Sequence, residues 1–257
     1  RVGKGVEMSD LRTHAMTVVH EQAAGGFEVR DRDFKTAASL TLKTDAANGL
    51  GIKAGLLGQE LLLKLINDPN TKAYDGLAYW AAGHYTNYKN ANQGTFDNSA
   101  TGRDLTNENV GWAVAQIEDR VMPDGTPRNL KAKWLLHGPS LKYKAQLALN
   151  AQYVNATSNP TSGEGKFLAA YDLKPICIPG LAKVGGKDQW IVAGELEGGG
   201  TFAKPFGIST LIPMTMTSYD GITAPMLKIM QQLKYLVTGD LAAYLGHPYL
   251  VQRCIVP

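Results

Sequence analysis

The clearest pattern of apolar and polar positions lies between residues 106 and 152. Apolar residues recur there at intervals of three and four positions, which predicts one apolar face of an amphipathic helix. The positions are Val110, Val114, Ile117 and Val121. Thr106 or Asn107 can cap the start of this helix. It should end before PDGTP at residues 123–127, because proline lacks a backbone donor and Asp-Gly favours tight turns.

A short strand and a second helix are predicted after this turn. Residues 133–136, with the sequence KWLL, are typical of a short buried strand. Gly138-Pro139 then places a proline where a helix can begin. Leu141, Ala145 and Ala148 would continue a narrow apolar face on that helix. The whole stretch offers no recognisable nucleophile, metal cage or phosphate loop.

A strand followed by a long helix is predicted earlier in the chain. Residues 40–44, LTLKT, suggest the strand. The helix is expected from about residue 52 to 67, and its many leucines leave little polar face, which indicates burial on most sides. Asp68-Pro69 should end it.

Three further segments near the N-terminus and after the long helix have little apolar surface. Residues 1–13 are polar and aperiodic, which suits an extended arm. Residues 16–34 alternate around an AAGG sequence and predict a hairpin, which is marginal alone and should lie on other structure. Residues 88–105 nearly lack large apolar groups, which favours a solvated loop or an intersubunit contact.

The C-terminal part alternates loops with short strand-like runs. Residues 166–178 and 185–200 each contain a strand candidate. Residues 226–256 predict two strands joined by a turn at Thr238-Gly239-Asp240. The first of these strands could instead be helical, because four of its apolar residues also fit a period of 3.6. They are Met226, Ile229, Met230 and Leu233.

Composition excludes several classes of protein. With 257 residues, 44% hydrophobic and 19% charged, the chain has the composition of a soluble globular protein of one large or two modest domains. A net charge of +3 is too small for a dedicated nucleic-acid binder. No run approaches the ~18 apolar residues of a membrane helix. Cys177 and Cys254 show no metal-binding spacing and favour reduced thiols.

Two glycine-rich motifs suggest nucleotide or phosphate binding, and both depart from the pattern that this chemistry needs. Gly49, Gly51 and Gly55 have the wrong spacing for a dinucleotide fingerprint and favour a loop-to-helix junction. Residues 163–166, GEGK, resemble half a phosphate loop. Pro160 stands where that motif needs glycine, and Phe167 replaces Ser or Thr.

Three polar pairs could suggest metal binding or catalysis. His84 and Asp75 lack the third ligand of a metal site, so we expect His84 to bind backbone groups in a turn. His137 and Ser140 lack the GxSxG sequence of a hydrolase and favour a strand-to-helix junction. Glu195 and Glu197, which would share one strand face, favour an exposed charged strand end. The sequence therefore predicts no catalytic, cofactor-binding or metal-binding residue.

The helix, turn, strand and helix at 106–152 resemble the Mu-type major head subunit family of tailed bacteriophages. In that family a DG-Pro turn leads to a P-x-x-L-L-V-P-P-x-L strand; here the run is DGTPRNLKAKWLLHGPSL. Lys133 stands where the family often has Pro or Phe, and His137-Gly138 where it usually has Val-Pro. Residues 40–87 are similar to the family's strand, long helix and DG-x-x-x-F-x-x-x-H-x-N segment. The last positions are Asp75, Gly76, Tyr79 or Trp80, His84 and Asn87.

The resemblance implies an α+β chain with the Hong Kong 97-like capsid fold. It implies an N-terminal arm at 1–13 and an extended loop, formed by a hairpin at 14–36, that lies across a neighbouring subunit. The peripheral domain, with its long spine helix, would comprise residues 37–135 and 226–257. The axial domain would comprise residues 136–225.

The resemblance also implies a function in assembly. The chain would be the major capsid protein of a tailed phage or prophage, assembled in the host bacterial cytoplasm into hexamers and pentamers of a shell around double-stranded DNA. Further partners would be a portal and a scaffold, protease or decoration protein. Lys4, Arg12 and Lys53 could face the DNA, with weak, non-specific contact. Partial numbering or proteolytic removal of a preceding segment would each explain a start at Arg1.

Two other functions stay open from the sequence. One is an encapsulin-like nanocompartment shell, which would share the fold but would be expected to lack the DG-Pro block. The other is a soluble α/β enzyme, which would need a converging polar pocket that these residues do not assemble.

Overall fold

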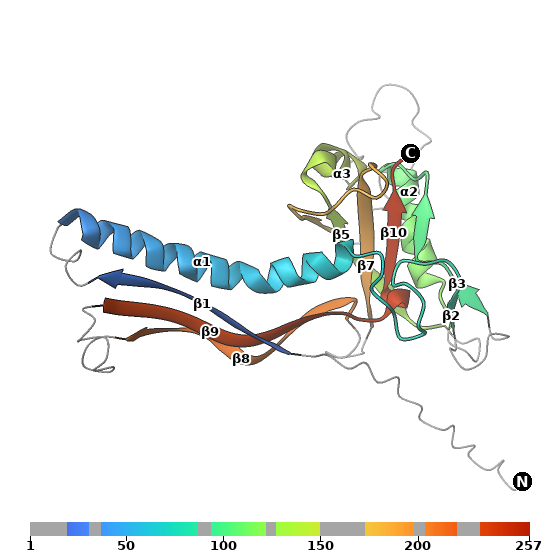
Figure 1. The fold of residues 1–257 in the computed structure, drawn as a ribbon. Helices are drawn as coiled ribbons and strands as arrows, with labels where there is room; N and C mark the ends of the chain where they lie inside the picture. Colours follow the sequence, from blue (N-terminus) through green and yellow to red (C-terminus); the bar gives the residue numbers. More distant parts are fainter. Residues whose placement is uncertain are drawn as a thin grey trace, which may run out of the picture.

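The computed structural model describes seven segments of the chain, which form an elongated limb and a compact unit (Figure 1). The segments are residues 20–30, 37–86, 94–121, 127–149, 173–197, 204–219 and 232–257. The limb contains one long helix and three long strands. These are β1 (Glu21–Arg30), α1 (Ala37–Asn67), β8 (Phe206–Tyr219) and β9 (Gln232–Leu245).

The limb is a helix laid along one face of an antiparallel sheet. The strand order is β1-β9-β8, and α1 contacts all three strands, β9 most extensively. At 1.5 Å per residue the 31-residue helix is about 46 Å long. The 14-residue strands β8 and β9 are also about 46 Å long at 3.3 Å per residue. Helix and strands therefore match in length, which gives the limb its shape.

Small residues bring α1 close to the sheet. An added Cβ at Gly58 would lie 3.0 Å from Cδ1 of Ile208, and one at Gly25 would lie 3.5 Å from Cδ1 of Leu50. Glycine thus allows the helix and the strands to approach closely at these two positions. Ile52 and Leu56, by contrast, stay 64% and 45% exposed on α1.

The compact unit is built on a five-stranded mixed sheet in the order β4-β10-β7-β5-β6. β5 and β6 are parallel, as are β10 and β4, whereas β7 is antiparallel to both of its neighbours. The strands are β4 (Ser99–Thr101), β5 (Leu130–His137), β6 (Lys174–Cys177), β7 (Gln189–Leu196) and β10 (Val251–Ile255). Around the sheet lie β2 (His84–Tyr85), β3 (Thr95–Phe96), α2 (Asn107–Glu118), α3 (Lys142–Leu149) and two 3-10 turns, η3 (Pro139–Leu141) and η6 (Pro248–Leu250).

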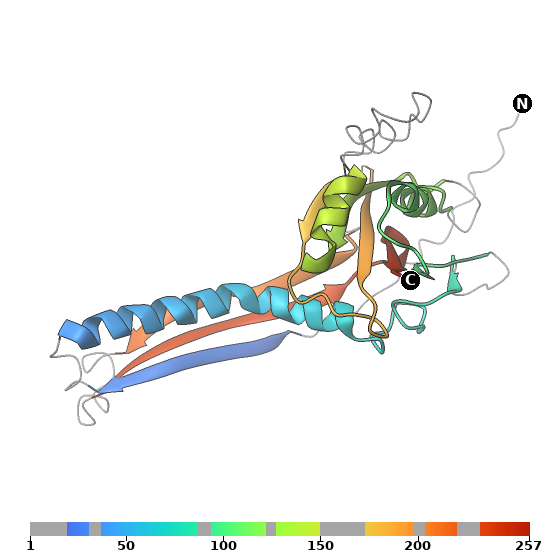
Figure 2. The ribbon, with the colours of Figure 1, turned by 90° about the horizontal axis from the view of Figure 1, so that it is seen from above.

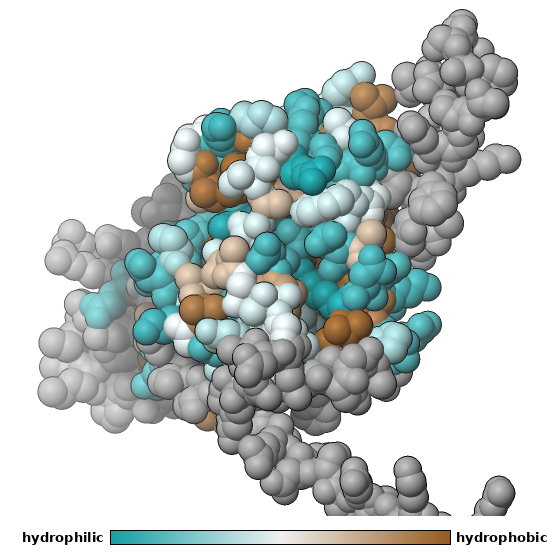
Figure 3. Space-filling view, turned by 90° about the vertical axis from the view of Figure 1, so that its right-hand side faces the viewer, coloured by the Kyte–Doolittle hydropathy of each residue, from teal (hydrophilic) through white to brown (hydrophobic). Residues whose placement is uncertain are grey.

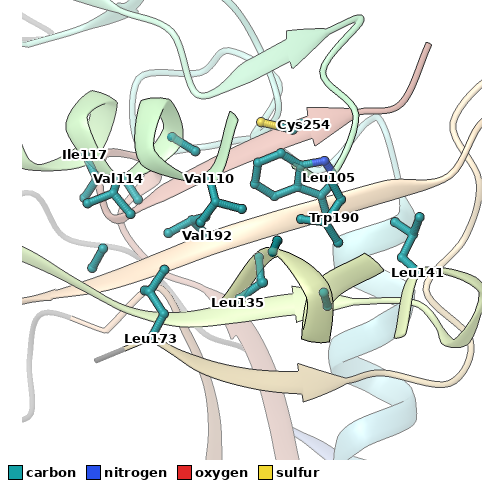
Figure 4. Packing of buried hydrophobic residues seen from close by; sticks show 14 of the residues in the cluster. Leu105, Val110, Val114, Ile117, Leu135, Leu141, Leu173, Trp190, Val192 and Cys254 are labelled. Carbon is teal, nitrogen blue, oxygen red and sulfur yellow. The ribbon is translucent and has the colours of Figure 1, made fainter. Parts of the chain in front are cut away.

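Both faces of the central strand β7 are buried, which explains its nearly continuous apolar sequence. Trp190 and Val192 face one cluster, which includes the apolar side of α2 and is drawn in Figure 4. Ile191 and Ala193 face a second cluster on the other side of the sheet. Successive side chains of a strand point to opposite faces, so a strand between two layers is apolar at every position.

The second cluster joins the compact unit to the limb. It contains Ile66 from the end of α1, Leu245 from the end of β9, and Tyr79 and Trp80 from the segment after α1. The indole nitrogen of Trp80 donates to the carbonyl oxygen of Ile66 at 2.9 Å. The Tyr79 hydroxyl donates to the carbonyl oxygen of Pro205 at 3.1 Å. Buried aromatic packing and these two bonds fix the limb at its base.

Several predicted elements are confirmed. α2 begins at its Thr106 cap, whose side chain accepts from the Asn109 amide, and it buries Val110, Val114 and Ile117. β5 contains the predicted strand at 133–136, and the helical turn η3 starts at Pro139 and leads directly into α3. Val121 lies beyond the end of α2 and is 42% exposed, so its predicted place on the helix is wrong.

Two predicted turns and one predicted strand are wrong. The glycines at 25 and 26 lie inside β1, which pairs with β9 from Glu21 to Arg30 without a turn, so the predicted hairpin turn at residues 23–26 is wrong; residues 14–19 and 31–36 lie outside the described part of the chain. Gly239 lies inside β9, so the predicted turn at residues 238–240 is wrong. Of the four residues that also fit a helix, Leu233 is in β9, and Met226, Ile229 and Met230 lie outside the described residues. Residues 40–44 belong to α1, which starts at Ala37 because the sheet supports a longer helix than the leucines alone indicate.

The predicted domain boundaries stay a prediction, and three strands can be compared with them. A boundary between residues 135 and 136 would fall inside β5. β10, assigned by sequence with the spine helix, pairs with β4 of the same predicted domain and with β7 of the predicted axial domain. β8, assigned with the axial domain, lies in the limb. Residues 88–105 were predicted to be a solvated loop or an intersubunit contact. Residues 94–105, the described part, contain β3, β4 and the fully buried Asn98, so they are not a solvated loop.

Gly239 provides a test of the limb's packing. An added methyl group there would lie 2.9 Å from Cα of Met214 in β8, so we expect Gly239→Ala to lower the free energy of unfolding by about 1–3 kcal/mol. In the control Gly49→Ala, the new Cβ has no neighbour within 4 Å, and the substitution should stabilise α1 by about 0.5–1 kcal/mol. Denaturant unfolding measures both, and effects of the same sign would contradict this packing.

Candidate functional site

The sequence-predicted pair His84 and Asp75 does come together, in the buried segment between α1 and β2. Nδ1 of His84 lies 2.6 Å from Oδ2 of Asp75, and Nε2 lies 3.1 Å from the carbonyl oxygen of Tyr79. Both side chains are fully buried. A carboxylate oxygen and a carbonyl oxygen both accept hydrogen bonds, so each ring nitrogen of His84 faces an acceptor.

The surroundings of this pair explain its role. Nδ2 of Asn98 donates to the same Tyr79 carbonyl at 2.6 Å, and the Leu77 amide donates to Oδ1 of Asp75 at 3.1 Å. The predicted contact of His84 with backbone groups in a turn is confirmed. These bonds fix the turn that carries Tyr79 and Trp80 at the base of the limb.

Arg120 is the largest charged feature of the interior, and the sequence analysis did not identify it. Its side chain lies at the end of α2, next to the chain that leads into β10, with 7% of its surface exposed. The guanidinium donates five hydrogen bonds over distances of 2.6–3.3 Å. The acceptors are the carbonyl oxygens of Asp97, Pro248, Tyr249 and Val251 and the side-chain oxygen of Gln252.

The electrostatics of Arg120 suit a structural role. Burial lowers the pKa of its guanidinium to about 9, which leaves it charged at neutral pH. Its charge is balanced by carbonyl dipoles and by the face of Phe96, whose centroid lies 4.8 Å from Cζ. Burial also raises the pKa of the Tyr79 hydroxyl, so that group stays neutral and donates to Pro205. These groups are engaged in holding the fold together.

The other sequence candidates do not form a chemical site. Gly49, Gly51 and Gly55 all lie within α1, so the expected loop-to-helix junction is wrong and no phosphate loop exists there. Residues 163–166, with Pro160 and Phe167, lie outside the described part of the chain. His137 is buried at the junction of β5 with η3 and donates from Nδ1 to the Gly138 carbonyl oxygen at 2.9 Å. Ser140 lies exposed in η3.

The acidic pair at the end of β7 is occupied by structural contacts. Glu195 forms an ion pair with Lys133 across to β5, and both side chains are more than one third exposed. Glu197 lies just beyond the strand, and its amide donates to the Asn129 carbonyl oxygen at 3.0 Å. The pair thus lies at an exposed charged strand end, as predicted, although only Glu195 is in the strand.

The described residues contain neither a metal-binding cluster nor a membrane-spanning helix. No group of three or more His, Cys, Asp or Glu side chains there could hold a metal ion. No helix in the same residues is both long and apolar enough to cross a membrane. Both cysteines are free, Cys177 on the surface and Cys254 in the core, where burial raises the pKa of its thiol to about 12.

Exposed apolar side chains are concentrated on the limb rather than on the end of the compact unit. At that end, hydrophilic residues dominate the coloured surface and apolar residues are scattered (Figure 3). On the limb, Ile52 and Leu56 are exposed on α1, together with four residues of β8. Those four are Ile208, Leu211, Ile212 and Met216. A limb with so much uncovered apolar surface is typical of a protein that binds a partner.

Comparison with known proteins identifies the fold. No protein-family model matches the sequence, and a search of curated proteins found no significant match. Among solved structures, the Cyanophage Pam1 capsid asymmetric unit matches with a TM-score of 0.54 and 11% identity, over 100% of this chain and 82% of that chain. The capsid of Myoviridae phage XM1 matches with a TM-score of 0.54 and 9% identity, over 93% of this chain and 74% of that one.

A third structure agrees with these two. The acidic stable capsid structure of Helicobacter pylori bacteriophage KHP30 has a TM-score of 0.53 and 8% identity, over 93% of this chain and 75% of that chain. At such low identity the similarity establishes the fold alone. The chain therefore has the mixed α and β fold of phage capsid chains, and the similarity extends over nearly its whole length.

Arg120 provides a test of the interior. Arg120→Met keeps much of the side-chain length but leaves the buried carbonyl oxygens without donors, so we expect the free energy of unfolding to fall by about 3–5 kcal/mol. Arg128 is a matched control, because its Nε also donates to a carbonyl oxygen, that of Val121 at 2.8 Å, but its side chain is only half-buried and its other contacts are a long bond of 3.4 Å to the Thr86 carbonyl oxygen and the Tyr249 ring. Arg128→Met should cost about 1 kcal/mol or less. Equal losses in denaturant unfolding would contradict the assigned role of Arg120.

Proposed function

We propose that the chain is the major capsid protein of a tailed phage or prophage and that its function is self-assembly. The observation that carries this proposal is the similarity of fold to three phage capsid structures at TM-scores of 0.53–0.54. The exposed apolar side chains of the limb support it, because a subunit of a shell must bury such surface against its neighbours. The chain acts as a structural protein rather than an enzyme.

Within this proposal, the limb corresponds to the peripheral domain, with α1 as its spine helix, and the compact unit corresponds to the axial domain. Subunits would form hexamers and pentamers of an icosahedral shell around double-stranded DNA, with portal, scaffold, protease or decoration proteins as further partners. Of the three basic residues predicted to face DNA, Lys53 is exposed on α1, whereas Lys4 and Arg12 lie outside the described residues. The narrower assignment to the Mu-type head subunits stays a prediction, because no family model matches.

Negative-stain electron microscopy of the expressed chain tests the proposal directly. We expect closed shells, tubes or capsomer rings, because identical subunits with complementary surfaces assemble into symmetric structures. Size-exclusion chromatography provides the second measurement. A uniform monomer at assembly concentrations, with turnover of a small substrate, would contradict the proposed function.

A further inference from the structure

The outer edge of β8 is the longest unpaired backbone edge among the described strands. The sheet order β1-β9-β8 leaves β8 with a hydrogen-bonded partner on one side only. No other strand of the described chain pairs with the opposite side. A strand edge presents a row of free N–H and C=O groups, and such an edge can accept a further strand from another molecule.

The sequence of β8 lacks the charged residues that protect exposed edges. None of its 14 residues, FGISTLIPMTMTSY, is charged, whereas 19% of the whole chain is. Its exposed apolar side chains are Ile208 at 46%, Leu211 at 68%, Ile212 at 50% and Met216 at 53%. Proteins that keep an edge strand in solvent usually place lysines or other charges on it. β8 therefore has the properties of an edge that becomes covered.

Pro213 and two irregularities in register interrupt β8 near its centre. The register with β9 shifts between Thr210 and Ile212 and again between Ile212 and Thr215. Proline and bulges can also protect an edge against unwanted pairing. Here they leave two regular runs of five residues, 206–210 and 215–219, on either side. The interruption therefore restricts where a partner strand can pair and does not close the edge.

The same limb offers a complementary edge on its opposite side. β1 pairs with β9 along one side, and its other side is likewise unpaired among the described strands. Figure 2 shows β1 and β8 along the two long sides of the sheet. Residues 23–26 of β1 are Ala-Ala-Gly-Gly, so this run of the edge carries no charged or bulky side chain.

The direction of the strands makes this pairing geometrically consistent. β1 and β8 both run antiparallel to β9, so they are parallel to each other. Two limbs that lie side by side and point the same way would place β8 of one copy parallel to β1 of the next. Such a contact joins two different surfaces, and repeating it closes into a ring when the rotation between copies allows.

We propose that the free edge of β8 is an interface between copies of this chain and that the β1 edge of the neighbouring copy covers it. This inference rests on the proposed function. In a shell of identical subunits every limb is surrounded by identical limbs, so the partner is a second copy. The contact would consist of main-chain hydrogen bonds between parallel strands, with the exposed apolar side chains of β8 buried beside them.

Three lysine substitutions test the interface. Met216→Lys places a charge on an exposed apolar side chain of β8, and Thr210→Lys and Thr215→Lys each add one at an exposed position of a regular run without removing a large apolar side chain. Each should abolish particles in electron microscopy, because a buried edge does not accept an unpaired charge. Gln59→Lys is the matched control, since Gln59 is a polar, exposed residue on α1 of the same limb, and this variant should assemble. Thermal unfolding of the unassembled variants confirms that each is folded.

Hydrogen exchange of the unsubstituted protein gives an independent measurement. Backbone amides of both β8 and β1 should gain protection when free subunits assemble. The inference is overturned if either strand stays unprotected in particles, if the β8 variants assemble normally, or if Gln59→Lys fails in the same way as they do. Failure of the unsubstituted chain to assemble would instead overturn the proposed function, so the two failures are distinguishable.

Discussion

The compact unit depends on one buried cation. Arg120 connects the end of α2 to the Asp97 carbonyl before β4 and to the carbonyls and Gln252 around the start of β10. A buried guanidinium is costly to desolvate, and only a complete set of acceptors makes it tolerable. The segments that supply these acceptors can therefore occupy few other positions. The geometry of the sheet edge formed by β4 and β10 follows from this requirement.

The sequence predicts elements whose signals are local. α2 has a capping threonine and a stripe at helical spacing, and η3 and α3 follow the predicted Gly138-Pro139 start. β7 is recognisable because both of its faces are buried, which makes residues 190–194 a continuous run without a polar side chain. The bond of His84 to a backbone group of the preceding turn also follows from the sequence. Such features depend on neighbouring residues, and a single sequence contains that information.

Features that depend on distant contacts were not predictable. Glycine in β1 and β9 suggests turns, yet an added Cβ at Gly26 would lie 2.5 Å from the Tyr235 carbonyl oxygen, and one at Gly239 would lie 2.6 Å from Sδ of Met214. These glycines therefore mark close approach between strands, which has the same sequence signal as a turn. Arg120 gives no signal either, because its acceptors are up to 132 positions away. The free edge of β8 becomes visible only when the strand order is known.

The position of β10 determines how late in synthesis the five-stranded sheet can finish folding. This strand lies between β4 and β7, inside the sheet, although it follows both in the chain. Arg120 and Gln252 are 132 positions apart, so the ribosome adds the acceptor long after the donor. Contacts this remote in sequence form slowly because closing the loop between them costs entropy. A nascent chain therefore cannot complete its central sheet during most of its synthesis, and full folding is delayed until residues 248–255 have left the ribosome.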